Sequence, residues 1–177
     1  TQFARLIGAT PLQIDLTLVN MTNYISKNTP AIHMESFYKK FSLVSREKFD
    51  GLLITGAPIE HLEFDKVDYW SELKEIFNWT QTNVHSTMAV CWGAMAMMHY
   101  FYNIPKYALK EKAFGCFEHI NLVPENRYMH GFTDRVHIPV SRWSEIRHRD
   151  LKKHPNLEVL LSSDQTGPCL IDDKTFY

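Results

Sequence analysis

The sequence predicts a doubly wound α/β fold with a mostly parallel sheet, and two observations indicate it. Short apolar segments typical of buried strands alternate with segments whose apolar residues recur at helical spacing. The connections between them are short, as in parallel βαβ units. With 177 residues, of which 45% are hydrophobic, the chain has the size of one domain. We therefore expect a single α/β domain over residues 1–177.

Three strands are expected in the first half of the chain. Residues 11–19 alternate apolar and polar side chains, which predicts a half-buried strand. Residues 49–55 form a mostly apolar run that stops at a Gly-Ala-Pro turn, which is typical of a central strand. Residues 86–90 form the third strand, which leads directly into a helix.

Two helices separate and follow these strands. Residues 69–82 carry apolar side chains at helical spacing, and residues 93–102 are good helix formers that Pro105 terminates. The chain also opens within a helical pattern. The second half is less regular: strands are expected over residues 113–122, 135–140, 157–161 and 169–171, with a short helix over residues 143–151.

Charge and composition exclude several classes of protein. Nineteen Lys and Arg against twenty Asp and Glu give a net charge of -1, too balanced for non-specific nucleic-acid binding. No apolar run reaches the ~20 residues that a membrane-spanning helix needs. Three widely spaced cysteines are unlike a disulfide framework and fit a reducing compartment. We expect a cytoplasmic protein without a membrane segment.

Cys91 is the candidate nucleophile. It lies where a predicted strand ends and a helix begins, flanked by the small residues Ala89, Gly93 and Ala94. Such a turn lifts a nucleophile above the sheet edge, as in hydrolases. The start of the helix favours a thiolate at Cys91 and directs the backbone N–H of Trp92 toward a developing oxyanion. The alternative is a small buried residue that ends a core strand, since buried cysteine is common.

The other cysteines are weaker candidates. Cys116 and His119 are three residues apart, but no further ligand has the spacing of a metal site. We therefore expect a core cysteine and a polar histidine there, and no metal. Cys169 follows Gly167 and Pro168, and we expect it to be structural.

No histidine is an obvious base for Cys91. His85 lies ~20 Å upstream along the strand and His99 ~12 Å along the helix. His61 follows the strand over residues 49–55, on a loop that we expect to face the substrate. We expect this residue and the more distant histidines to be solvated surface side chains, namely His119, His130, His137 and His154.

Several segments spread over nearly the whole chain together resemble one known family. They are Thr1-Gln2-Phe3, Leu6, Gly8, Pro11-Leu12-Gln13, Asn28-Thr29-Pro30, Phe49-Asp50-Gly51-Leu52, Thr55-Gly56-Ala57-Pro58, Tyr69-Trp70, Val90-Cys91-Trp92, Ile104-Pro105-Lys106, Glu111-Lys112 and Ser141-Arg142. In these segments the sequence resembles the homoserine O-acyltransferases of the homoserine transsuccinylase type. The resemblance implies a class I glutamine amidotransferase-like (flavodoxin-like) fold. It also implies transfer of an acyl group from acyl-CoA to the hydroxyl of L-homoserine through an acyl-thioester on Cys91, with no cofactor.

The resemblance also assigns three further residues. Lys112 and Ser141 match positions that contact the substrate. Glu60 matches the position at which acetyl-using members have Glu and succinyl-using members have Gly. A carboxylate there would repel the free carboxylate of a succinyl group and occupy its space. Acetyl-CoA is therefore the expected donor, for a reaction in methionine biosynthesis.

Part of the family pattern is not found in this sequence. The resemblance implies a catalytic His-Pro-Glu segment and an acceptor-binding Arg beyond Tyr177, so we expect a fragment that lacks N- and C-terminal parts. His154-Pro155-Asn156 imitates that segment without its Glu. A homodimer is the expected assembly. Serine remains an alternative acceptor, and a glutamine amidotransferase-like hydrolase or an inactive binding module remains an alternative function.

Overall fold

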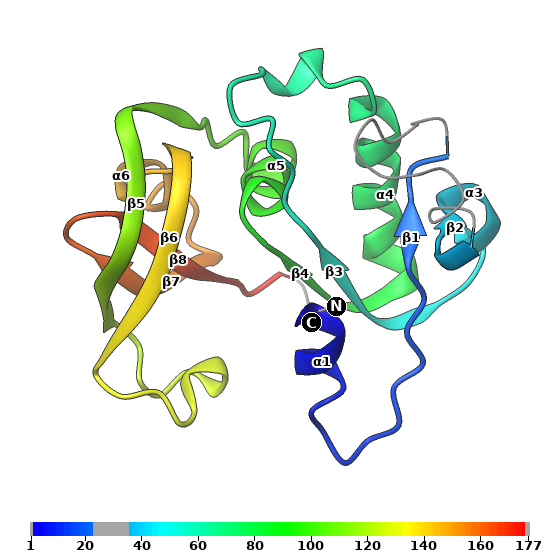
Figure 1. The fold of residues 1–177 in the computed structure, drawn as a ribbon. Helices are drawn as coiled ribbons and strands as arrows, with labels where there is room; N and C mark the ends of the chain where they lie inside the picture. The colour runs from blue at the N-terminus through cyan, green and yellow to red at the C-terminus, as the bar shows by residue number, and fades with distance from the viewer. Residues whose placement is uncertain (1, 23–35, 176–177) are drawn as a thin grey trace.

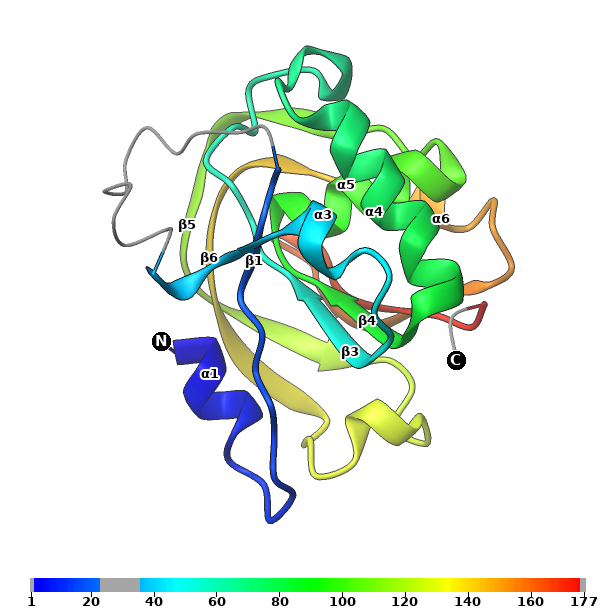
Figure 2. The same cartoon turned by 90° about the vertical axis from the view of Figure 1, so that its right-hand side faces the viewer.

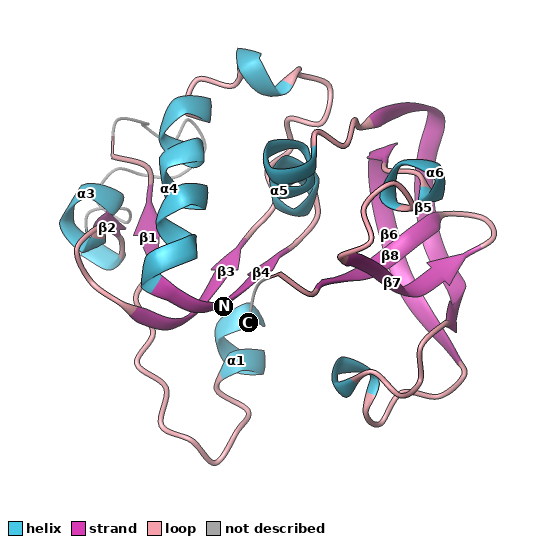
Figure 3. Ribbon diagram, turned by 180° about the vertical axis from the view of Figure 1, so that it is seen from behind, coloured by secondary structure: helices cyan, strands magenta, loops and turns pink. Residues whose placement is uncertain are grey.

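The computed structural model describes residues 2–22 and 36–175 (Figure 1). Residues 28–30, one of the segments that carry the family resemblance, lie outside the described residues. The elements form two groups that lie side by side, an α/β group and an antiparallel sheet (Figures 1 and 3). Within the described ranges, no helix is long and apolar enough to cross a membrane.

The N-terminal segment differs from the expected strand over residues 11–19. After α1 (Gln2–Ile7), only β1 (Val19–Asn20) is a strand, and it pairs in parallel with β2 (Lys39–Lys40). Leu12, Ile14, Leu16 and Leu18 are between 36% and 72% exposed. An alternating pattern gives a half-buried strand only where a neighbouring strand and a core receive it, and most of this segment has neither among the described residues. The short helix α3 (Phe41–Val44) follows β2.

The predicted parallel pairing of the two strands is confirmed, but the prediction of a central strand over residues 49–55 is wrong, because among the described residues that sheet contains only two strands. β3 (Phe49–Ile54) pairs in parallel with β4 (Val84–Ala89). A loop containing the 3-10 helix η1 (Phe64–Lys66) and then α4 (Trp70–Asn83) connects them, and α5 (Trp92–Tyr102) follows β4. Both helices match the predicted ranges to within one residue at each end. In Figure 2, β3 and β4 run side by side below these two helices.

The second half forms an antiparallel sheet with the strand order β6-β5-β7-β8. Its strands are β5 (Tyr107–Asn121), β6 (Arg135–Glu145), β7 (Leu157–Ser163) and β8 (Gly167–Asp173). The 3-10 helix η2 (Arg127–Met129) lies between β5 and β6. All four expected strands are present, but the parallel arrangement is confined to the first half of the chain.

The predicted helix over residues 143–151 is mostly wrong. β6 continues to Glu145, and only α6 (His148–Leu151) is helical. Glu145 pairs with Tyr107 and Ser144 with Ala108, which extends the ladder past a bulge in β5. Pairing between residues this far apart in sequence overrides the local helical pattern.

Helix α5 joins the two groups. Its buried side chains include Trp92, Met95 and Met97, and they belong to one hydrophobic cluster with Phe77 of α4 and Leu157 of β7. The helix lies between α4 and the antiparallel sheet (Figures 1 and 3). Because this core fixes α5, it also fixes the turn that precedes the helix.

Candidate active site

Cys91 occupies a strained turn between β4 and α5. Its backbone has φ 58° and ψ -126°, and it is the residue immediately before the first residue of α5. Such positive φ values are costly for a residue with a β-carbon. The turn is secured by a hydrogen bond from the Val90 N–H to the Ile54 carbonyl, 2.9 Å. Cys91 is exposed, so the alternative of a buried strand-ending cysteine is wrong.

Two glycines make room for this turn. A β-carbon on Gly56 would lie 2.9 Å from the β-carbon and 3.3 Å from the Sγ of Cys91. A β-carbon on Gly93 would lie 2.8 Å from the carbonyl oxygen of Thr55. The contacts at 2.9 Å and 2.8 Å are shorter than non-bonded contacts of a β-carbon allow. The loop after β3 therefore touches the cysteine turn on two sides.

The backbone N–H of Trp92 is available at this turn. Gly93 N–H donates to the Val90 carbonyl, and the N–H groups of Ala94 and Met95 donate to the Cys91 carbonyl. Among the hydrogen bonds of the described residues, the Trp92 N–H has no acceptor. It lies 3.5 Å from the β-carbon position of Gly56. A free donor beside an exposed thiol is the arrangement that an oxyanion hole requires.

Glu60 connects the loop after β3 to strand β6. Its Oε2 accepts hydrogen bonds from the backbone N–H of Trp143, at 2.6 Å, and from the hydroxyl of Ser144, at 3.3 Å. Lys106 donates to the backbone carbonyl of Glu60 at 2.8 Å. In the described ranges, no Lys, Arg or His forms an ion pair with its carboxylate. Sequence reasoning missed these partners because they lie 83 and 84 residues away along the chain.

Lys112 and Ser141 lie on the antiparallel sheet. Lys112 is in the bulge of β5, with its Nζ 5.2 Å from the ring centroid of Phe114. Ser141 of β6 pairs with Phe114, and both are exposed on the same face. Neither residue hydrogen-bonds to Cys91 within the described part of the chain. Ser141 lies three residues before Ser144, so the partner of Glu60 is on the same strand.

No histidine of the described residues hydrogen-bonds to Cys91. His85 is exposed on β4, six residues upstream of Cys91, and His99 stacks on Phe64 at 4.5 Å between ring centroids. His61, His130 and His137 are exposed, as expected. His154 is half-buried, and its ring lies 5.1 Å from that of Tyr102.

The predictions for Cys116 and His119 are wrong. Cys116 is exposed and His119 is only 1% exposed, because alternation along β5 turns them to opposite faces. The Nδ1 of His119 lies 2.9 Å from the Phe117 carbonyl oxygen. Cys169 is exposed on β8. Among the described residues, no group of three or more His, Cys, Asp or Glu side chains could hold a metal ion.

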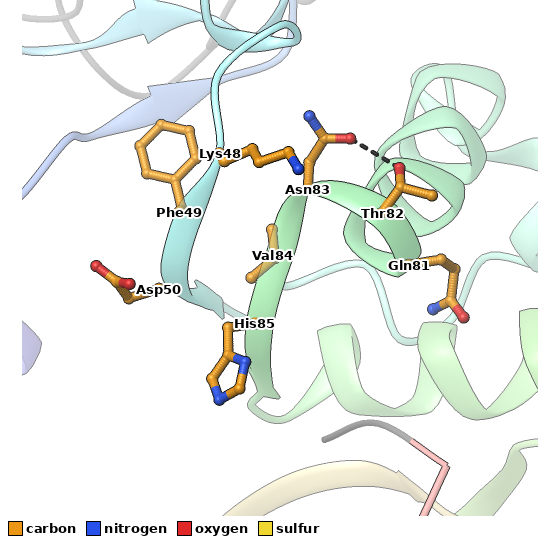
Figure 4. Close-up of a pocket in the computed structure, with 8 residues that line it drawn as sticks. All are labelled: Lys48, Phe49, Asp50, Gln81, Thr82, Asn83, Val84 and His85. Carbon is orange, nitrogen blue, oxygen red and sulfur yellow. Dashed lines mark hydrogen bonds between the residues drawn. The ribbon is translucent and has the colours of Figure 1, made fainter.

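A shallow hollow lies at the opposite edge of the parallel pair (Figure 4). It is lined by residues from the starts of β3 and β4 and the end of α4, including Lys48, Asp50, Asn83 and His85. Figure 4 shows Asn83 accepting a hydrogen bond from Thr82, at 2.7 Å. Cys91, at the carboxyl end of β4, is not part of this hollow. Ligands of open α/β sheets bind at the carboxyl ends of strands, so Cys91 is the stronger candidate.

Solved structures share this fold at low sequence identity. A putative GMP synthase subunit from Thermoplasma acidophilum matches with a TM-score of 0.60 and 14% identity, covering 93% of this chain and 81% of that one. A glutamine amidotransferase from Thermotoga maritima matches with a TM-score of 0.56 and 12% identity, covering 69% and 52%. The glutamine amidotransferase-like α/β architecture expected from the sequence is therefore confirmed.

Sequence relatives are much closer. Homoserine O-acetyltransferases from Roseobacter denitrificans and Dinoroseobacter shibae are 59% and 60% identical over 173 residues. Each alignment covers 98% of this chain and 57% of the relative, so the chain spans little more than half the length of those proteins. The family model described as homoserine O-succinyltransferase matches residues 1–176. With that match across nearly its whole length, the chain belongs to the homoserine O-succinyltransferase family.

Proposed function

We propose that the protein containing this chain is a homoserine O-acetyltransferase that uses Cys91 as its nucleophile. It would transfer the acetyl group of acetyl-CoA to the hydroxyl of L-homoserine, in methionine biosynthesis. Family membership and the names of the relatives support the reaction class. The observation that carries the role of Cys91 is its exposed position in the strained turn at the start of α5.

The reaction proceeds in two acyl transfers. The Cys91 thiolate attacks the thioester carbonyl of acetyl-CoA, a carbon–sulfur bond forms, and the CoA thiolate leaves and takes up a proton. One thioester replaces another, so the intermediate lies close in energy to the reactants. The hydroxyl of homoserine then attacks the acetyl-Cys91 carbonyl, loses its proton to a base and releases the Cys91 thiolate.

Two groups near Cys91 support this sequence of steps. The free Trp92 N–H would donate to the carbonyl oxygen as it becomes an oxyanion in each step. The absence of a side chain at Gly56 lets the loop after β3 approach the Cys91 side chain closely, which holds the thiol in place. The proposed base is the histidine of the His-Pro-Glu segment that the family resemblance implies.

Glu60 supports acetyl-CoA as the donor. Its carboxylate has only neutral donors among the described residues, so its negative charge remains uncompensated by an ion pair. A succinyl group would bring a second carboxylate toward that charge, whereas an acetyl group carries none. The relatives reported above are named as acetyltransferases.

Lys112 and Ser141 are the proposed substrate contacts on the antiparallel sheet. Lys112 could bind a carboxylate or phosphate through its ammonium group, and Ser141 could hydrogen-bond to a polar group of the substrate. Homoserine and serine differ by one methylene, which a binding site distinguishes by only about 1 to 3 kcal/mol. Serine is therefore a competing acceptor that must be assayed.

CoA release from acetyl-CoA, measured for the complete protein with and without each amino acid, tests this function. We expect rapid release with L-homoserine, slower release with L-serine and little with L-glutamine. Glutaminase activity without thioester turnover would contradict the transferase and support the hydrolase alternative. No turnover of either kind would support a binding module.

A further inference from the structure

The Glu60 carboxylate is held by two donors on a strand distant in sequence. Its Oε2 accepts from the Trp143 N–H at 2.6 Å and from the Ser144 hydroxyl at 3.3 Å. Both donors address the same oxygen, and the backbone carbonyl of Glu60 is held separately by Lys106 at 2.8 Å. Hydrogen bonds therefore hold both the backbone carbonyl and the side-chain carboxylate of Glu60, although this residue lies on a loop.

The Trp143 N–H is available because of an irregularity in the sheet. β6 is an edge strand, and Trp143 has no partner in its register with β5, where the bulge between Ala108 and Ala113 interrupts the ladder. An edge strand presents unpaired N–H groups that need acceptors. The carboxylate of Glu60 satisfies this one.

Ser144 supplies the second donor from the interior. It is 2% exposed, and its hydroxyl also lies near a weaker acceptor, the Sδ of Met95 at 3.5 Å. A serine has one O–H to donate, and a carboxylate accepts it more strongly than a thioether does. Because water is largely excluded there, the bond to Glu60 is the main polar role open to this hydroxyl.

Ser144 also places Glu60 relative to the nucleophile. Met95, which contacts the Ser144 hydroxyl, lies on α5 one turn after Cys91. Glu60 follows Gly56, which touches Cys91, by four residues on the same loop. The bond from Ser144 to Glu60 therefore connects β6 to the loop after β3, and both segments also contact α5 or the turn before it.

We propose that Ser144 is a positioning residue for acyl-donor selectivity, because its hydroxyl and the Trp143 N–H hold the Glu60 carboxylate in one place beside the acyl group. A glutamate free to rotate could move away from the charged end of a succinyl group. A fixed Glu60 carboxylate cannot move away, so both charge repulsion and steric exclusion act on succinyl-CoA. This inference rests on the proposed function.

A double-mutant cycle in the complete protein tests the proposal. The quantity measured is the ratio of kcat/KM for succinyl-CoA to that for acetyl-CoA. We expect Ser144→Ala to raise this ratio about three- to tenfold, the range for losing one ordinary hydrogen bond while the Trp143 N–H keeps its own bond to Glu60. In a Glu60→Gly background, Ser144→Ala should change it no further, since Ser144 acts through Glu60.

Ser162→Ala is the matched control. Ser162 is also buried on a strand of the antiparallel sheet, and its Oγ lies 2.7 Å from Nε2 of His148 rather than near Glu60. We expect it to leave the donor ratio unchanged. An unchanged ratio in Ser144→Ala, or the same change with and without Glu60, would overturn the proposal. A wild-type protein that transfers neither acyl group would instead overturn the proposed function, and this inference with it.

Amide exchange at Trp143 reports on the same bond without catalysis. In the complete protein, NMR solvent exchange of the Trp143 N–H should be several-fold faster in Ser144→Ala, faster still in Glu60→Gly, and unchanged in Ser162→Ala. Equal exchange rates in Ser144→Ala and the wild type would show that Ser144 does not hold the carboxylate, which would overturn the proposal even if the donor ratio changed.

Discussion

A β-carbon on Gly56 would lie 2.9 Å from the β-carbon of Cys91, closer than two carbons can approach without displacing one another. The absence of a side chain at Gly56 is therefore a condition for the position of the thiol. The same loop reaches Glu60, so one connection after β3 both makes room for the proposed nucleophile and carries the proposed selectivity residue.

Gly56→Ala should slow acyl transfer strongly while the protein still folds. The added methyl must displace the Cys91 side chain or the loop, and a misplacement of about 1 Å can cost on the order of a hundredfold in rate. The measurement is kcat/KM for acetyl-CoA, with circular dichroism as the check on folding. Gly51→Ala is the control, because its β-carbon would meet only the Ser86 carbonyl oxygen at 3.8 Å. Equal activity of Gly56→Ala and Gly51→Ala would contradict the claim that the position of the Cys91 thiol requires a glycine at residue 56.

Cys91→Gly should be more stable than Cys91→Ala. Both changes remove the sulfur, but only glycine adopts φ 58° and ψ -126° without strain, which costs about 1 kcal/mol or more for a residue with a β-carbon. Urea denaturation gives the two free energies of unfolding. Cys116 lies in a strand, so there the order should reverse: Cys116→Gly should be less stable than Cys116→Ala. The same order at both positions would argue against strain at Cys91.

Glu60→Gln separates charge from volume at the acyl site. The amide keeps an oxygen that can accept from Trp143 and Ser144, but it loses the negative charge. We expect the kcat/KM ratio of succinyl-CoA to acetyl-CoA to rise about tenfold, and less than in Glu60→Gly, which also opens space. Glu63→Gln, an exposed residue on the same loop, is the control. If Glu60→Gln and the wild type give the same kcat/KM ratio of succinyl-CoA to acetyl-CoA, the charge of Glu60 does not exclude the succinyl group.

Asp150 should contribute to stability in a pH-dependent way. Hydrogen bonds from Lys153 and Tyr107, each 2.8 Å, lower the pKa of its carboxyl below 3.8. Because the folded pKa is depressed, the contribution is complete above pH 3.8 and is lost as the pH falls through the lower, folded value. The difference in unfolding free energy between wild type and Asp150→Asn should therefore shrink in acid.

Denaturation at a series of pH values checks this expectation. Asp65→Asn serves as the comparison, because Asp65 is exposed and its ion pair with Lys66 is 3.5 Å long. It should change stability little at any pH. A difference for Asp150→Asn that grows as the pH falls would have the wrong sign.

The elements with strong local patterns could be predicted from the sequence. The apolar residues of α4 and α5 recur at helical spacing and include most of their buried side chains, and β3 and β4 are short runs rich in apolar residues next to turn signals such as Gly56. The strand expected over residues 11–19 is reduced to β1, because alternation alone supplies no partner strand. Most of the helix expected over residues 143–151 is instead strand or loop, because β6 pairs with β5. The two strands are too far apart in sequence for the local pattern to reveal that pairing.

The candidate site was predicted only in part. Cys91 was identifiable because a strand, a cysteine and a run of helix formers follow one another directly. Gly56 was missed as a site residue, although a glycine shortly after a strand is a usable signal for close approach of another backbone. Ser144 has no local signal, since its role depends on Glu60, 84 positions away. His119 was misassigned because the face it occupies is set by the register of β5.

The most direct measurement of the central claim is peptide mass spectrometry of the protein after brief exposure to acetyl-CoA. Cys91 and Cys116 are both exposed, so accessibility alone would not distinguish them, whereas burial raises the pKa of the Cys169 thiol. We predict one acetyl group on Cys91 alone, lost when L-homoserine is added. Acetylation of the other cysteines with Cys91 unmodified, or of all three alike, would contradict the assignment of Cys91 as the nucleophile.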